Sequence, residues 1–120
     1  MNVCVVEDNI SIRKLFSTLL KKSGFTVVDF ETAWSAIDWM RTNITDVVIL
    51  DILLPDLSGL DAIGIIRQIK GYESIPVIAV TGFAADTDKD KYLAAGFDHY
   101  ISKPVNVPTF AQEIKDLLKN

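Results

Sequence analysis

Acidic side chains stand directly after short apolar runs, at the positions where buried strands end. Glu7 and Asp8 follow the run at residues 3–6, and Asp51 follows the run at 46–50. Carboxylates that meet without a cation between them repel one another and raise their own pKa values. Oxygen ligands of this kind suit a hard divalent cation, and Mg²⁺, with Mn²⁺ as an alternative, is the natural choice.

A hydroxyl and an ammonium group mark the ends of two further runs. Thr81 closes the run at 76–81, and Lys103 follows the run at 99–102. Together with the three carboxylates, Lys103 leaves a formal charge of two negatives, which one divalent cation balances. Because Mg²⁺ readily adds a phosphate oxygen to a few carboxylates, the whole set predicts a site for phosphate chemistry.

Other chemistries are excluded by residues that the sequence lacks. The turn after the first run has no glycine-rich loop, so a nucleotide phosphate would meet acids there instead of backbone amides. A single cysteine, Cys4, and a single histidine, His99, do not make a zinc cluster or a Ser-His-Asp triad. Phosphate is therefore expected to be held by metal, hydroxyl and ammonium.

These residues must be positioned by a repeated strand–helix pattern. Strands are expected at residues 3–6, 26–30, 46–50, 76–81 and 99–102. The first, third and fourth are almost solid Val, Ile and Leu, as in parallel strands that are covered on both faces. The second alternates more, which indicates an edge strand.

The stretches between the strands carry apolar residues at helical spacing. Ser58 with Asp61 three residues later predicts the start of one of these helices, and Gly24 predicts the end of another. In the second helix, Trp34 is expected in the core and Trp39 at the surface. The pattern predicts one α/β domain over 1–120, a flavodoxin-like (βα)5 doubly wound parallel sheet with strand order 2-1-3-4-5. Such sheets bind ligands at the carboxyl ends of their strands.

Composition narrows the functional class. The chain has 120 residues, of which 49% are hydrophobic and 23% charged, and its formal net charge is −4. A negative charge without a basic cluster argues against nucleic acid as a partner, and the apolar stretches are too short to cross a membrane. Cys4 lies in an apolar run and is expected to be buried and inert. A reducing, cytoplasmic location fits these observations.

The motifs together resemble those of response-regulator receivers of two-component systems. They are VEDN at 6–9, DILLPDLSG at 51–59, IPVIAVT at 75–81 and YISKP at 100–104, in this order along the chain. Among receivers, the chain is most similar to single-domain ones of the DivK type.

This resemblance implies a role for each strand-end residue. Asp51 would be the phospho-acceptor, and Asp8, Asp51 and the backbone carbonyl of Leu53 would bind Mg²⁺, with Glu7 acting directly or through water. Thr81 and Lys103 would each contact a phosphoryl oxygen, and Lys103 would pair with the Asp51 carboxylate before phosphorylation.

The resemblance also implies a switch and a rate. Tyr100 would turn inward when Thr81 is drawn to the phosphate, and the peptide bond between Lys103 and Pro104 would be cis. Leu53 and Phe83 would flank the phosphoryl group. Because apolar side chains do not orient water, we expect slow self-dephosphorylation.

The implied function is that of a phosphorylation-controlled binding module, not of a conventional enzyme. Its partners would be a histidine kinase or a histidine phosphotransfer protein, and a target protein bound by the fourth helix, fifth strand and fifth helix. The chain would be a monomer or a phosphorylation-dependent dimer. Three alternatives remain: a receiver fold that is inactive, an interaction domain that never meets phosphate, and a phosphohydrolase of the haloacid dehalogenase type. The last needs a second acid where this chain has Leu53.

Overall fold

The computed structural model describes residues 1–82 and 86–119, which form five strands and five helices in alternation. The elements are β1 (Asn2–Val6), α1 (Ile10–Lys22), β2 (Thr26–Phe30), α2 (Ala33–Met40), β3 (Val47–Asp51), α3 (Gly59–Ile66), β4 (Val77–Thr81), α4 (Asp86–Ala95), β5 (His99–Ser102) and α5 (Phe110–Leu117).

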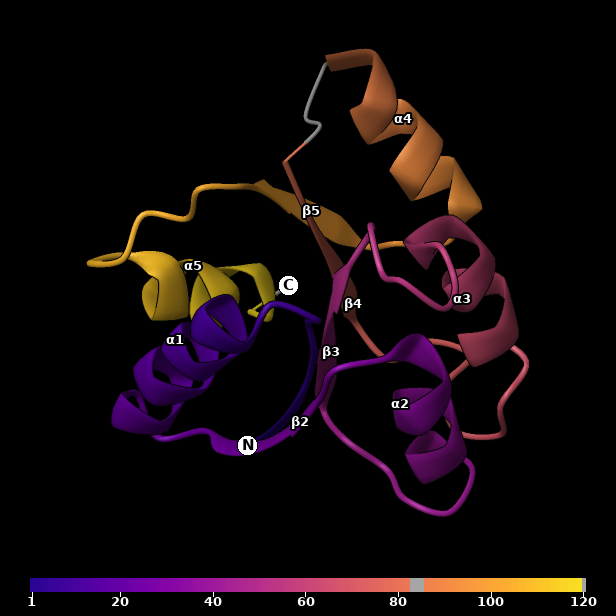
Figure 1. Cartoon of the computed structure of the whole chain (residues 1–120), viewed down its shortest axis with the longest axis horizontal. Coiled ribbons are helices and arrows are strands. Elements are labelled where there is room, and N and C mark those ends of the chain that lie inside the picture. Colours follow the sequence, from indigo (N-terminus) through magenta and orange to yellow (C-terminus); the bar gives the residue numbers. More distant parts are fainter. Residues whose placement is uncertain (83–85, 120) are drawn as a thin grey trace.

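The strands form one sheet in the order β2-β1-β3-β4-β5, and every neighbouring pair is parallel. Helices α1 and α5 cover one face, and α2, α3 and α4 lie on the other (Figure 1). The predicted flavodoxin-like winding is therefore confirmed, as is the placement of the second strand at an edge.

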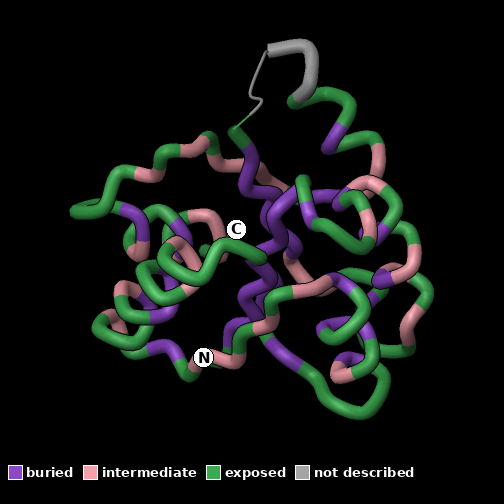
Figure 2. Tube along the Cα trace, in the orientation of Figure 1, coloured by how far each residue is buried: buried purple, intermediate pink, exposed green. Residues whose placement is uncertain are grey.

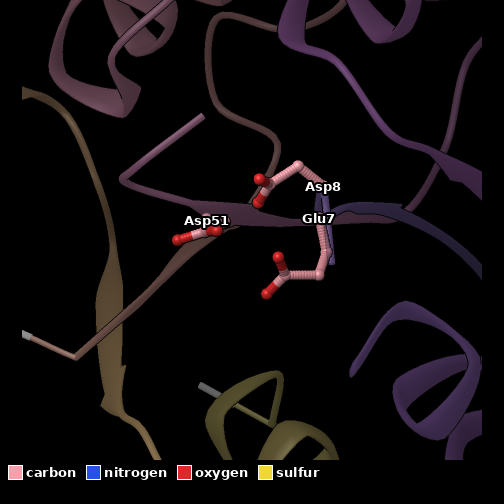
Figure 3. A group of neighbouring side chains, drawn as sticks. All are labelled: Glu7, Asp8 and Asp51. Atoms are coloured by element: carbon pink, nitrogen blue, oxygen red, sulfur yellow. The ribbon is translucent and has the colours of Figure 1, made fainter. Parts of the chain in front are cut away.

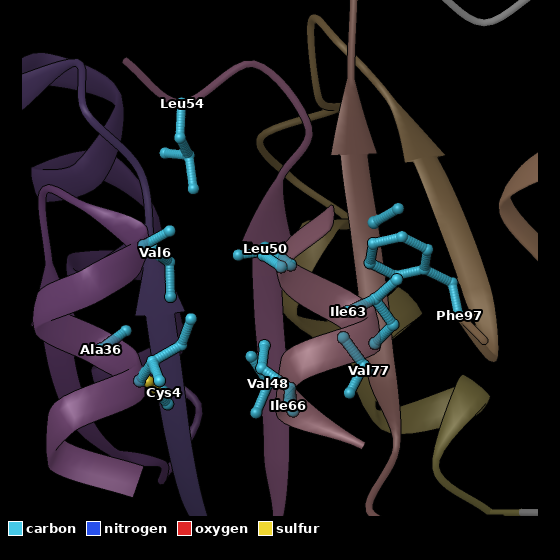
Figure 4. Close-up of a cluster of buried hydrophobic side chains, with 14 of the residues drawn as sticks. Cys4, Val6, Ala36, Val48, Leu50, Leu54, Ile63, Ile66, Val77 and Phe97 are labelled. Atoms are coloured by element: carbon cyan, nitrogen blue, oxygen red, sulfur yellow. The ribbon is translucent and has the colours of Figure 1, made fainter. Parts of the chain in front are cut away.

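The sheet separates two hydrophobic clusters. Successive side chains of a strand point to opposite faces, so Val3 and Val5 pack with α1 and α5, whereas Cys4 and Val6 pack with α2 and α3 (Figure 4). Buried segments follow the central strands in Figure 2, and all residues of β3 and β4 are buried. Burial raises the pKa of the Cys4 thiol to about 12, in keeping with the expected inert thiol.

Three strands have ends that differ by one residue from the prediction: β1 begins at Asn2, β3 spans Val47–Asp51, and β4 begins at Val77. Strand β3 includes Asp51 itself, which pairs with Val80 of β4. Strand β4 begins at Val77 because Pro76 has no N–H to donate, although the Pro76 carbonyl still accepts a hydrogen bond from Val48 N at 3.0 Å.

Polar side chains begin three of the helices. Asn9 accepts a hydrogen bond from Ile12 N at the start of α1, and Thr32 caps α2 in the same way. Ser58 accepts one from Asp61 N at 3.2 Å, as its spacing predicted. None of the helices in residues 1–82 and 86–119 combines the length and apolar character needed to span a bilayer.

The two tryptophans of α2 are placed opposite to the prediction. Trp34 is 42% exposed, whereas Trp39 is partly buried and packs against Phe30 with ring centroids 5.8 Å apart. The buried stripe of α2 includes Ala33, Ile37 and Met40. Trp34 lies outside this stripe, on the solvent side of the helix. Trp39 lies beside the stripe, where it covers the edge strand β2.

The guanidinium group of Arg67 bonds to the loops that precede β4 and β5. Arg67 donates to the carbonyls of Tyr72 and Ile75 at 3.0 and 2.6 Å, and to the carbonyl of Gly96 through two nitrogens at 3.2 and 2.8 Å. It also donates to Asp98 at 2.9 Å. Arg67 therefore ties the end of α3 to the segment between α4 and β5.

Candidate functional site

The strand-end residues singled out by the sequence meet at the carboxyl ends of adjacent strands. Glu7 directly follows β1, Asp51 ends β3, Thr81 ends β4, and Lys103 follows β5. The parallel register aligns these ends, since Asp51 pairs with Val80, next to Thr81. The sheet therefore brings together residues that are far apart in the chain.

Three carboxylates form the centre of this site. Glu7, Asp8 and Asp51 each have a carboxylate oxygen within 4.8 Å of those of the other two, and Figure 3 shows the group at the ends of β1 and β3. Glu7 and Asp51 are buried, and Asp8 is exposed. The site thus has a buried floor with one carboxylate at its solvent side.

Lys103 contacts both buried carboxylates. Its Nζ lies 2.5 Å from Oε1 of Glu7 and 3.4 Å from Oδ2 of Asp51. Burial works against the ammonium, but the hydrogen bond to Glu7 and the charges of Asp51 and Glu7 outweigh it, so the pKa of Lys103 is raised. The expected pairing with Asp51 is present, and the shorter contact is with Glu7.

Among the carboxyl groups that the structure describes, Glu7 has the pKa that is shifted most. Burial raises its pKa to about 7, and the Asp51 charge acts in the same direction, against the hydrogen bonds from Lys103 and from Asn9 N. The Asn9 N–H donates to Oε2 at 3.1 Å. Desolvation is thus the larger cause, where the sequence suggested repulsion between the acids.

The backbone after Asp51 is held by its own side chain. Leu53 N donates to Oδ1 of Asp51 at 3.2 Å, and the Leu53 side chain is 57% exposed. An exposed apolar side chain therefore stands beside the carboxylate. Phe83, the other residue expected to flank the site, lies outside the described residues.

The two residues of the expected switch lie on neighbouring strands. Thr81 is buried at the end of β4, and Tyr100 is half-buried in β5. The Tyr100 ring is 6.4 Å from the Tyr92 ring, and Lys89 Nζ lies 5.7 Å from its centroid. The peptide bond between Lys103 and Pro104 is cis, as expected.

Two side chains that the sequence analysis did not single out hold the site's loops. Asp56, beyond β3, accepts hydrogen bonds from Ala33 N at 3.1 Å and Trp34 N at 2.9 Å, at the start of α2. Burial opposes ionisation of Asp56, but these bonds outweigh it and its pKa is lowered. Arg13, on α1, donates to the backbone carbonyl of Glu7 at 2.9 Å. Neither contact has a local spacing that would reveal it.

The parallel five-stranded sheet and the acidic cluster at its carboxyl ends together indicate a class of protein, the receiver domains. The model of the response regulator receiver domain family matches residues 3–115. The chain belongs to this family, whose members are signalling domains of two-component systems.

Within this family, the chain is similar to polar-differentiation response regulators named DivK. Those of Brucella ovis and Brucella anthropi are each 38% identical to this chain over 117 residues, which is 98% of the chain and 95% of the relative. Among solved structures, the chemotaxis response regulator CheY4 of Vibrio cholerae has a TM-score of 0.91 at 25% identity, with 97% of each chain covered. The chain is thus a receiver similar to DivK over almost its whole length.

Proposed function

We propose that this receiver accepts a phosphoryl group from a phosphohistidine onto Asp51 in a Mg²⁺-dependent reaction, and that phosphorylation changes a protein-binding surface. One observation carries the proposal. The Asp51 carboxylate lies in a cluster with Glu7 and Asp8 and has an ammonium group 3.4 Å away. The proposed nucleophile, an acidic cluster for the cation and a positive charge therefore lie together at one edge of the sheet.

The donor set fits a hard divalent cation. The clustered atoms are all carboxylate oxygens within 4.8 Å of one another, which suits Mg²⁺ or Mn²⁺ and not a soft metal. Asp8, Asp51 and the carbonyl of Leu53 would be its ligands, with Glu7 direct or through water. When bound, the ion supplies positive charge that offsets the carboxylates and the incoming phosphoryl oxygens.

The transfer is a displacement at phosphorus. An Asp51 carboxylate oxygen forms the new O–P bond while the N–P bond of the partner's phosphohistidine breaks. The electron pair of that bond stays on the imidazole nitrogen, which takes a proton from solvent. Lys103 and the Thr81 hydroxyl would each bind a phosphoryl oxygen, so the chain contributes mainly positioning and charge.

Switching would then run from Thr81 to Tyr100. A Thr81 hydroxyl drawn to the phosphoryl group leaves room behind it, which the Tyr100 ring would fill. The ring now lies near Tyr92 and the Lys89 ammonium, so turning inward changes the surface between α4 and β5. Phosphorylation would bias an existing equilibrium between the two ring positions.

The proposed function calls for two kinds of partner protein. A histidine kinase or a histidine phosphotransfer protein would donate the phosphoryl group, and a target protein would bind the face made by α4, β5 and α5. The signalling would take place in the cytoplasm. The protein would be a monomer or a phosphorylation-dependent dimer. Residues 1–120 would act as one receiver domain.

Two observations weigh against two of the three alternatives. A haloacid dehalogenase-type phosphohydrolase needs an acid two residues after its nucleophile, and Leu53 stands there. An interaction domain that never meets phosphate would have no use for two buried carboxylates beside one ammonium group, because charged groups are costly to bury.

The test is labelling by a small phosphodonor. Incubation with Mg²⁺ and acetyl phosphate is expected to add one phosphoryl group to the wild type and none to Asp51→Asn, as measured by intact mass. Asp61→Asn, which removes an exposed carboxylate from α3, is the matched control and should be labelled normally. A wild type that stays unlabelled, or an Asp51→Asn variant labelled equally, would refute the proposal.

A further inference from the structure

Arg13 reaches from α1 back to the turn that carries the acidic pair. Its Nη1 donates to the backbone carbonyl of Glu7 at 2.9 Å, and its side chain is 15% exposed. We infer that Arg13 is a positioning residue, which fixes the peptide between Glu7 and Asp8 and so orients Asp8 toward the cation. This inference rests on the proposed function.

The guanidinium group is itself held in place by a second pair of residues. Its Nε lies 3.9 Å from Oδ1 of Asp29, in β2. The other oxygen of Asp29 accepts a hydrogen bond from Ser17 Oγ at 2.9 Å, and Ser17 is 6% exposed. Ser17, Asp29 and Arg13 therefore form a chain that connects α1 and the edge strand to the Glu7 carbonyl.

Planarity of the peptide explains why holding this carbonyl matters. The Glu7 oxygen and the Asp8 nitrogen belong to one rigid unit, so fixing the oxygen fixes the direction in which Asp8 leaves the strand. The Glu7 N–H is bonded to the Phe30 carbonyl at 3.0 Å. Both sides of Glu7 are thus anchored, and Asp8 is the first side chain beyond the anchors and the exposed member of the cluster.

Charge and orientation predict opposite effects when Arg13 is replaced. A positive charge near the carboxylates repels a cation, so loss of that charge alone should tighten Mg²⁺ binding. Loss of the hydrogen bond should loosen the turn and weaken binding. Partners that orient metal ligands typically change affinity by about tenfold or more when removed. The sign of the change therefore identifies the role.

The experiment measures Mg²⁺ affinity by calorimetry for Arg13→Gln, Arg13→Lys and Ser17→Ala. Arg13→Gln is expected to raise the Kd about tenfold. Arg13→Lys keeps the charge but has a single nitrogen in place of the fork, so it should also bind more weakly than the wild type. Ser17→Ala should weaken binding to a smaller extent, because Asp29 remains. Lys14→Gln, an exposed neighbour with the same charge loss, should leave the Kd unchanged or slightly lower it.

A second readout separates positioning from general stability. In metal-free protein, amide hydrogen exchange across residues 7–9 should be faster in Arg13→Gln than in wild type. Ile114→Val, which shortens a buried side chain on α5 and so lowers the stability of the fold, should leave the Kd for Mg²⁺ unchanged.

Three results would overturn the inference. They are an unchanged or lower Kd in Arg13→Gln, a wild-type Kd in Arg13→Lys, and an equal loss of affinity in Ile114→Val. Each of them is read against a wild type that binds Mg²⁺. A wild type without Mg²⁺ affinity would instead refute the proposed function itself.

Discussion

The buried carboxyl group of Glu7 makes the stability of the metal-free protein depend on pH. Its pKa is about 7 in the folded chain, against 4.5 for an ordinary glutamate, chiefly because burial disfavours the charged form. A group that binds its proton more tightly in the folded state stabilises the fold at low pH and loses that contribution as pH rises. We therefore expect the free energy of unfolding to fall between about pH 4.5 and pH 7.

The magnitude follows from the two pKa values. At about 1.4 kcal/mol for each pH unit, the difference between 4.5 and about 7 corresponds to about 3 kcal/mol. Lys103 does not obscure this effect. Its pKa is raised above the ordinary 10.5, so its contribution to stability is lost only at more alkaline pH.

Urea unfolding in the presence of EDTA provides the assay. Wild type and Glu7→Gln are compared from pH 4.5 to pH 8, and the wild type should lose about 3 kcal/mol relative to the variant over this range. Groups other than Glu7 titrate in both proteins and cancel in the difference. Parallel curves for the two proteins would show that the pocket does not disfavour the Glu7 carboxylate.

Three further predictions concern hydrolysis, metal and the loops at the far end of the sheet. Leu53→Asn should lose its phosphoryl group faster than wild type, because an amide can orient water; equal lifetimes by intact mass would contradict the slow rate proposed for wild type. Mg²⁺ at ten times its Kd should add about 1.4 kcal/mol to the free energy of unfolding at neutral pH, and Asp8→Asn should abolish most of this gain in the same urea titration. Arg67→Ala should lower the free energy of unfolding by about 3 kcal/mol, because it leaves several carbonyls without their donor. Arg41→Ala removes an exposed ion pair and should lower it by less than about 1 kcal/mol. Similar losses in the two variants, measured by urea unfolding, would contradict the role of Arg67.

The sequence predicted the sheet and the location of the site because both follow from local patterns. Solid apolar runs identified β1, β3 and β4, and the polar residue that ends or follows each run identified a strand end. Parallel strands bring these ends together, so Asp51 and Lys103 could be placed near each other although they are 52 positions apart in the chain. The bounds of β1, β3 and β4 differed from the prediction, by one residue at each end concerned.

Contacts between distant side chains could not be predicted in this way. Trp34 and Trp39 both lie on α2, and which of them packs inward depends on the neighbouring strand β2. Asp56 bonds to the start of α2, 23 residues away along the chain, and no spacing rule connects the two. The preference of Lys103 for Glu7 likewise depends on side-chain reach at the strand ends.

The bonds of Arg67 also set how α4 can move. Gly96 directly follows this helix, and its carbonyl accepts two hydrogen bonds from the guanidinium group. The same group donates to the carboxylate of Asp98. The trailing end of α4 is therefore tethered to α3, so a displacement of α4 against the sheet would be a swing about that end. The largest travel would then fall on the opposite end of the helix, the one nearer to Thr81.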